Sequence, residues 1–412
     1  MMSNALNQNN ENEEYKYIVF VTGIIHSGQE KITNKGMLLS SADVLQRNIL
    51  DGMIENGISK IKIINSSFYG TYPKHCNKLI FRESNSKYNG TYDVEDIAFI
   101  NLPIINEYSR AKSIVKKLKY FSKNERILVI FYSLLLRNIV AMEEYKKINA
   151  NAEYCFIITD LPQNMNLAHN NDLIHRIVHS IGHYNYKLHS KTLNEYNDYC
   201  IYLTEKMKPY ALPQSHSMVM EGMIRETIIS ETDFGLDKPY HIVYTGGLSK
   251  ALGINYLLDA FSKIGREDIV LDIAGDGVDK EYVINCASRD KRIHYHGTLK
   301  PQQVSILQKN AYILVCPTLN NGVHSDFAFP AKLIEYLASG NYVVSNKLPG
   351  IPEDYYPYLF FPSKEDSDGL ADIIEHLLEK EERNPQKQRQ IQWVKKNKTT
   401  KTQTKRIIEF LC

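Results

Sequence analysis

A strand–helix–strand pattern runs through residues 312–345, which read YILVCPTLNNGVHSDFAFPAKLIEYLASGNYVVS. The apolar runs at its two ends have the length and residue types of buried strands. Between them, AKLIEYLAS has apolar residues at helical spacing, Pro330 suits the start of a helix, and Gly340 suits its end. Two parallel strands joined by a helix are the repeating unit of a parallel sheet covered by helices.

The same alternation of β-rich runs and helical patterns extends over the whole chain. In the first half, Ile127–Leu136 reads as one strand buried on both faces, because it is apolar throughout. The second half starts a new series with the strand HIVYTGGLS after a polar linker at 224–238. We therefore predict an α/β fold of two doubly wound, Rossmann-like domains facing a central cleft, where ligands of such sheets bind. The expected parts are a polar tail at 1–14, an N-terminal domain at 15–225, a C-terminal domain at 239–380 and a basic helix at 381–412 that packs back on the body.

Composition narrows the class of protein. Hydrophobic residues make up 43% and charged residues 23% of the 412 residues, as in ordinary globular proteins, and the net charge is only +2. This balance gives no reason to expect nucleic-acid binding. The longest uncharged apolar run is too short to span a bilayer, and the N-terminal tail lacks the apolar core of a signal peptide. The six cysteines have no metal-ligand spacing, so we expect reduced thiols, no metal and a cytoplasmic protein.

The helix that starts near residue 331 is the strongest candidate for a binding site. Free N–H groups and the helix dipole favour an anion at a helix N-terminus. Lys332 would add a positive charge for a diphosphate, and Glu335, three residues later on the same face, could accept hydroxyl groups of a ribose. The alternative is an amphipathic helix on which Lys332 and Glu335 form an ordinary surface ion pair.

Two glycine-rich turns follow other predicted strands of the second half. Gly246 and Gly247 end the strand HIVYT, with Lys250 shortly after, and Gly275 lies in the turn IAGDG. A backbone without Cβ atoms can approach a ligand closely, and Lys250 could reach a phosphate. Any tight turn would also use such glycines, so these turns alone are a weak signal.

In the first half, three residues follow strands whose carboxyl ends would face the cleft. Gly23 and His26 follow the first strand, and Asp160 ends the strand AEYCFIITD. His26 could contact a substrate, although an isolated loop histidine is more often simply solvated. Asp160 could orient a sugar or cap the next segment, and the sequence does not separate these alternatives.

A basic stretch between Arg110 and Arg126 has apolar residues at helical spacing between its charges. Such a helix could lie against anionic lipid headgroups, which would make the protein peripheral at the inner face of a membrane. The alternative is a solvated helix face. The charges are Arg110, Lys112, Lys116, Lys117, Lys119, Lys123 and Arg126.

The second half resembles the donor-binding domain of family-4 retaining glycosyltransferases, which have the GT-B fold. The resemblance rests on the strand–GGL–helix at 244–261, IAGDG, the strand ending in CPT and above all FPAKLIEYLASG. The first half resembles bacterial polysaccharide members of the family through GTYPKH, TDLPQNM, YLTEKM and VMEGMI. Together these segments extend the resemblance over about residues 15–380.

The resemblance implies site residues on the donor side. Glu335 matches a glutamate that binds the donor ribose, and Lys332 matches a basic residue of the same motif. Backbone amides around Phe327, Ala328 and Phe329 would contact the diphosphate or the sugar. The catalytic candidates are then Lys332, Asp326 and His26, the donor-binding set adds Gly246, Gly247, Lys250 and Gly275, and the acceptor-side set is Gly23, His26 and Asp160.

The resemblance implies transfer of a sugar from a nucleotide-diphosphate donor to a hydroxyl group of a glycan or lipid-linked glycan, with retention and without a metal. Three positions depart from the family pattern: Phe327 stands where many members have a glutamate, Gly247 replaces an arginine and Leu252 replaces a lysine. These departures favour an alternative, a non-catalytic subunit that stabilises an active partner glycosyltransferase. A nucleotide-sugar epimerase with the same architecture is a further alternative, without motif support.

Overall fold

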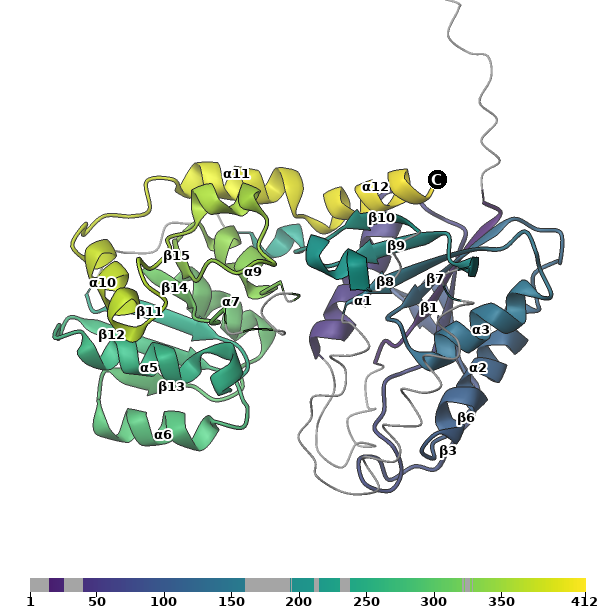
Figure 1. Cartoon of the computed structure of the whole chain (residues 1–412), viewed down its shortest axis with the longest axis horizontal. Coiled ribbons are helices and arrows are strands. Elements are labelled where there is room, and N and C mark those ends of the chain that lie inside the picture. Colours follow the sequence, from purple (N-terminus) through teal and green to yellow (C-terminus); the bar gives the residue numbers. More distant parts are fainter. Residues whose placement is uncertain are drawn as a thin grey trace, which may run out of the picture. The chain divides into compact units, whose positions relative to one another are not determined.

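The computed structural model (Figure 1) describes residues 15–25, 40–159, 193, 195–210, 215–229, 238–320, 322, 327 and 329–412. The chain divides into two compact units, each an α/β structure. Unit 1 consists of Met1–Tyr202, Lys208–Val219 and Thr404–Cys412. Unit 2 consists of Leu203–Met207 and Met220–Gln403. The chain thus passes from unit 1 to unit 2 and back more than once.

Unit 1 is built on an eight-stranded sheet with the order β10-β9-β8-β7-β1-β2-β5-β4. Neighbouring strands are parallel except for the antiparallel pair β4–β5. Strands β3 and β6 form a separate antiparallel pair and flank β4 and β5 in the sequence. The strands are β1 (Tyr17–Thr22), β2 (Ile61–Asn65), β3 (Ile80–Phe81), β4 (Ser84–Tyr88), β5 (Tyr92–Asp96), β6 (Phe99–Ile100), β7 (Ile127–Tyr132), β8 (Glu153–Ile158), β9 (Tyr199–Tyr202) and β10 (His216–Val219).

The helices of unit 1 are α1 (Ser40–Glu55), α2 (Ile105–Leu118) and α3 (Leu136–Lys146), with a 3-10 helix η2 (Glu205–Tyr210) at the boundary of the units. Helices α2 and α3 pack against each other, as Figure 1 shows. The prediction of one strand over Ile127–Leu136 was wrong in its second half. Strand β7 ends at Tyr132, Ser133 has a positive φ of 69° that turns the chain, and α3 starts at Leu136. The run carries no charge because strand, turn and helix start are nearly all buried.

Unit 2 is built on a five-stranded parallel sheet with the order β13-β12-β11-β14-β15. Residues of β11 alternate between two cores: Ile242 belongs to the one that contains Phe261 and Ile374, and Val243 to the one that contains Leu333 and Val394. Both faces of the sheet are therefore covered, which agrees with the doubly wound fold expected from the sequence. The strands are β11 (Tyr240–Thr245), β12 (Ile269–Ala274), β13 (Ile293–Tyr295), β14 (Ile313–Cys316) and β15 (Tyr342–Ser345).

The helices of unit 2 follow its strands in sequence. Helix α5 packs with α10 on one side, and α9 packs with α11 on the other. In the part of the chain that the structure describes, no helix has the length and apolar character needed to cross a membrane. The helices are α5 (Ile254–Lys263), α6 (Lys280–Arg289), α7 (Pro301–Lys309), α9 (Lys332–Ser339), α10 (Ser367–Leu378) and α11 (Lys387–Asn397), with 3-10 helices η3 (Glu226–Ile228), η4 (Lys250–Leu252) and η5 (Glu353–Tyr358). Helix α12 (Thr400–Leu411) begins in unit 2 and ends in unit 1.

The basic C-terminal segment forms two helices, α11 and α12, so the prediction of a single helix was wrong. The break lies at Lys398, whose side chain is buried with Nζ 3.2 Å from a carboxylate oxygen of Glu221. The next residue, Thr399, forms a β-bridge with Ile224. These contacts bind the segment to residues that follow β10. These contacts hold the end of α11 in place within unit 2.

Candidate functional site

The candidate site lies at the carboxyl edge of the sheet in unit 2, where the order of strands reverses. Strands β12 and β13 lie on one side of β11, and β14 and β15 on the other. Crossover helices on opposite faces leave a crevice at such a reversal, and ligands of doubly wound sheets bind there. Thr245 ends β11 at this edge, and Cys316 ends the neighbouring β14.

Helix α9 begins beside this edge and its amino end carries no side-chain cap. The N-cap residue, Ala331, has no polar side chain, and no side-chain hydrogen bond caps the helix in the described structure. The first turn is tight, since the amide of Leu333 donates to the carbonyl of Pro330 at 2.8 Å. At the other end Gly340 has a φ of 77°, which confirms the glycine cap expected from the sequence.

A network of polar side chains joins α9, α7 and the end of β11. Lys332 Nζ lies 2.8 Å from Glu335 Oε2, and the side-chain amide of Gln308 donates to the same oxygen at 3.1 Å. Gln308 also donates to Thr245 Oγ1 at 2.9 Å. The hydroxyl of Tyr336 accepts from the backbone amide of Thr245 at 2.9 Å. Three elements distant in sequence thus fix the carboxylate of Glu335 beside the strand end.

Some side chains of this network are buried and hold the others in place, and some are exposed and can contact a ligand. Gln308 and Tyr336 are buried, and burial raises the pKa of the Tyr336 phenol, which therefore stays neutral. The side chains of Lys332 and Glu335 are 41% and 32% exposed. An ion pair this exposed contributes at most about 1 kcal/mol to stability. The accessible pair is therefore free to bind a ligand at little cost to the fold.

The glycine turns next to the network pack closely against each other. Gly275 has a φ of 152°, and a Cβ built on it would lie 1.8 Å from the carbonyl oxygen of Gly246. Gly247 is exposed, and its carbonyl accepts from the hydroxyl of Tyr244 at 2.7 Å. Lys250 is exposed on η4, with its backbone amide bonded to Asp279. Close packing of the two turns is thus sufficient to explain the glycine at position 275. This is the alternative of an ordinary tight turn, which needs no ligand.

The loop before α9 contains the other donor-side residues. Phe329 is buried and its ring lies 5.3 Å from that of Tyr355, so its side chain belongs to the core. The carbonyl oxygen of Phe327 accepts from Thr204 Oγ1 at 3.3 Å. Asp326 and Ala328, like His26 and Asp160 of the first half, lie outside the described residues. Roles assigned to these four residues stay predictions.

The structure brings together only some of the predicted residues. Lys332 and Glu335 contact each other, and Gly246 follows Thr245 directly. Gly23 belongs to unit 1, where its amide donates to Gln46 Oε1 at 2.6 Å. Sequence reasoning missed Gln308, Thr245 and Tyr336. No local signal marks Gln308, since it lies among the polar residues that end the QQVSILQKN helix.

The basic stretch from Arg110 to Arg126 does not form a continuous exposed face, so this prediction was wrong for two of its members. Arg110 is 1% exposed, and its guanidinium donates to Ser66 Oγ at 2.8 Å. Lys117 is buried and lies 2.9 Å from Glu95. Both cations serve contacts inside unit 1 and are not available to lipid headgroups.

Among the described residues, no group of three or more His, Cys, Asp or Glu side chains could hold a metal ion. One cluster of such residues surrounds Asp272 on β12, which is buried. His241 Nδ1 and His296 Nε2 each lie 2.6 Å from one of its oxygens. Burial acts to raise the pKa of Asp272, but the hydrogen bonds from these two histidines outweigh it, and the pKa is lowered.

The segment that contains the candidate site matches a known family model. Residues 239–380 match the family model described as Glycosyl transferases group 1. The matched segment contains β11, α7 and α9, and thus every residue of the network described above. No curated protein matches the chain in sequence.

Solved structures of the GT-B fold match nearly the whole chain. Sucrose-phosphate synthase from Thermosynechococcus elongatus is 12% identical, with a TM-score of 0.64 over 96% of this chain and 98% of that one. HepE of Anabaena, solved in complex with UDP, is 12% identical, with a TM-score of 0.63 over 96% and 99%. The lipopolysaccharide outer core galactosyltransferase WaaB is 14% identical, with a TM-score of 0.61 over 96% and 99%. The chain therefore has the fold of GT-B glycosyltransferases, as the resemblance implied.

Proposed function

We propose that the protein is a retaining glycosyltransferase that moves a sugar from a nucleotide-diphosphate donor to a hydroxyl group of a glycan or lipid-linked glycan. One observation carries this proposal: the uncapped amino end of α9 lies with Lys332 and Glu335 at the carboxyl edge of a sheet that matches a glycosyl transferase family model. The UDP complex of HepE, a protein of the same fold, supports a nucleotide as the ligand.

In the proposed reaction, negative charge develops on the departing diphosphate. The ammonium group of Lys332 and the amino end of α9 would stabilise this charge, and such preorganised groups typically contribute about 3–4 kcal/mol each. Glu335 would accept the ribose hydroxyls of the donor, while Gln308 holds its carboxylate in place from a buried position. We propose no metal cofactor, because these groups supply the positive charge. Asp326 and His26 remain the further catalytic candidates.

The acceptor would bind to unit 1, at the edge of its sheet where β1 ends. Gly23 lies there, directly after β1, and His26 and Asp160 follow the strands β1 and β8 in sequence. We place the protein in the cytoplasm. The sequence supports this location, since its six cysteines have no metal-ligand spacing and several lie in apolar runs, as in proteins kept reduced.

Thermal unfolding with UDP, GDP, ADP and their sugars tests the proposal. A nucleotide at 100 times its dissociation constant should stabilise the protein by about 2.7 kcal/mol. Lys332→Ala and Glu335→Ala should each lower donor turnover by at least about tenfold, which corresponds to about 1.4 kcal/mol. The matched control is Lys291→Ala, an exposed lysine in the loop before β13. If no nucleotide stabilises the protein, the non-catalytic subunit becomes the better explanation.

A further inference from the structure

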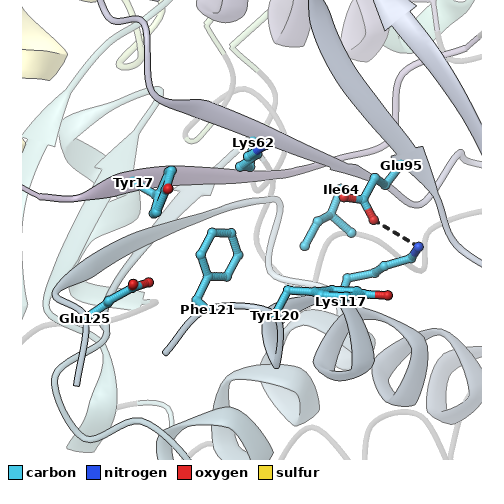
Figure 2. Close-up of a pocket in the computed structure, with 8 residues that line it drawn as sticks. All are labelled: Tyr17, Lys62, Ile64, Glu95, Lys117, Tyr120, Phe121 and Glu125. Atoms are coloured by element: carbon cyan, nitrogen blue, oxygen red, sulfur yellow. Dashed lines mark ion pairs between the residues drawn. The ribbon is translucent and has the colours of Figure 1, made fainter. Parts of the chain in front are cut away.

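A pocket opens on unit 1 over one face of its sheet, beyond the end of α2. Its volume is about 320 Å³. Figure 2 shows Tyr17 and Phe121 on one side of it, the ion pair of Lys117 and Glu95 on the other, and Lys62 on the strand above. The complete lining is Tyr17, Lys62, Ile64, Glu95, Lys117, Tyr120, Phe121 and Glu125.

The pocket follows from the register of the strands and the length of α2. Lys62 and Ile64 are two residues apart on β2, so they point to the same face, and Glu95 of β5 lies opposite Ile64. Helix α2 covers this face but ends at Leu118. The residues after it, Tyr120 and Phe121, line the pocket before the chain enters β7.

Aromatic rings supply flat apolar surfaces in this pocket. The rings of Tyr17 and Phe121 lie 5.3 Å apart and are tilted by 53°, which fixes both. Tyr120 is 77% exposed, the greatest exposure among the large apolar and aromatic side chains of the described part of unit 1. Beside the pocket this ring offers an exposed flat apolar surface that ends in a polar hydroxyl, the combination that enriches tyrosine at binding surfaces.

The charges of the pocket are largely paired. Lys117 Nζ lies 2.9 Å from Glu95 and 3.3 Å from Glu83, and Glu125 pairs with Lys16 at 2.5 Å. Lys62 has no ion pair within the described ranges. Because the carboxylates and ammonium groups nearly balance, the pocket offers no concentrated charge for a phosphate or a polycation. It offers instead hydrogen-bond donors and acceptors on all sides of an apolar ring surface.

We propose that this pocket binds a pyranose ring of a glycan. The apolar face of a sugar ring, formed by its C–H groups, would stack on Tyr120, and its hydroxyls would bond to Lys62, Glu95 and Glu125. A volume of about 320 Å³ lies at the low end for ligand pockets and suits one or two sugar rings. The assignment rests on the chemistry of this pocket alone and not on the donor site of unit 2.

Ligand-observed saturation-transfer NMR on the full chain tests the proposal. The probes are the methyl glycosides of glucose, galactose, N-acetylglucosamine and glucuronic acid. We expect saturation of the ring C–H protons of at least one probe, and binding that is about fivefold weaker or worse in Tyr120→Ala, as loss of one aromatic contact predicts. Tyr120→Phe keeps the ring and should bind like the wild type. Lys119→Ala, an exposed neighbour outside the pocket, is the matched control.

A second variant, Lys62→Met, tests the polar side of the pocket and should weaken binding of the same probe. The proposal is overturned if none of the four glycosides receives saturation from the wild type, or if Tyr120→Ala binds them unchanged. Stabilisation of Tyr120→Ala by nucleotide, measured in parallel, keeps this result separate from the function proposed for unit 2. A urea unfolding curve of Tyr120→Ala equal to that of the wild type shows that the variant is folded and that any loss of glycoside binding is local.

Discussion

Replacing Glu335 by alanine should weaken nucleotide binding strongly but lower the free energy of unfolding only modestly. In the folded protein its carboxylate pairs with Lys332 at 2.8 Å, but both side chains are about one-third exposed or more. Loss of so exposed a pair should cost about 1 kcal/mol of unfolding free energy or less, and loss of the acceptor for Gln308, which keeps its bond to Thr245, adds about 1 kcal/mol. Loss of a charged acceptor for two ribose hydroxyls should cost about 1.5–3 kcal/mol of binding, or roughly 10- to 150-fold in affinity.

Isothermal titration with the nucleotide that stabilises the wild type most, and urea unfolding without nucleotide, measure these two quantities. Glu335→Gln is the matched control, because it keeps the shape and one acceptor oxygen and should lose less affinity than Glu335→Ala. The reasoning is refuted if Glu335→Ala binds nucleotide like the wild type. It is equally refuted if the variant loses several kcal/mol of stability, since Glu335 would then be a structural residue.

Three further changes test contacts of unit 2. Gln308→Leu removes the buried donor to Glu335, and should cost about 1–3 kcal/mol of stability and also weaken nucleotide binding. Glu221→Ala leaves the buried ammonium of Lys398 without its nearest carboxylate, and should cost about 3–5 kcal/mol in urea unfolding. Asp272 has a lowered pKa in the folded state, so its carboxylate stabilises the protein above the unfolded pKa of about 3.9 and this contribution is lost as pH falls through the folded pKa. Asp272→Asn should therefore lower stability near neutral pH, with a difference from wild type that shrinks in acid.

Each of these changes has a control. Gln308→Glu keeps the length of the side chain but sets a second carboxylate beside Glu335, so it should weaken nucleotide binding as well; unchanged binding in both variants would argue against a positioning role. Adding Lys398→Met to Glu221→Ala should restore much of the lost stability, and a loss below about 1 kcal/mol in the single variant would contradict the burial argument. For Asp272→Asn, a stability difference that grows toward low pH would show that the sign is wrong.

The regular parts of the fold were predictable because their sequence signals are local. Pro330, the apolar spacing of AKLIEYLAS and Gly340 define α9 within eleven residues, and the structure confirms a helix from Lys332 to Ser339. The edge pair β4–β5 was not predictable, because most residues of β4 are exposed and polar and show no apolar alternation. The start of helix α3 was hidden because its first residue, Leu136, belongs to the uncharged apolar run that begins with β7.

The candidate site was predictable only where its residues are neighbours in sequence. Lys332 and Glu335 are three residues apart, so helical geometry alone brings them together. Gln308 reaches Glu335 from a different helix, 27 residues earlier, and Thr245 from a strand still further away. Only the packing of α7 and α9 against the sheet makes these contacts, and no local pattern encodes it.

The assignment of most of helix α12 to unit 1 affects the order in which the two units can fold during synthesis. Thr404–Cys412 belong to unit 1, where the ring of Phe410 packs edge-on against Tyr199 at 5.6 Å. During synthesis, domains generally fold in order from the amino terminus. Here the first unit to leave the ribosome lacks one of its own pieces until the whole second unit has been translated. Until then, the surface around Tyr199 that Phe410 covers stays uncovered in the nascent unit 1.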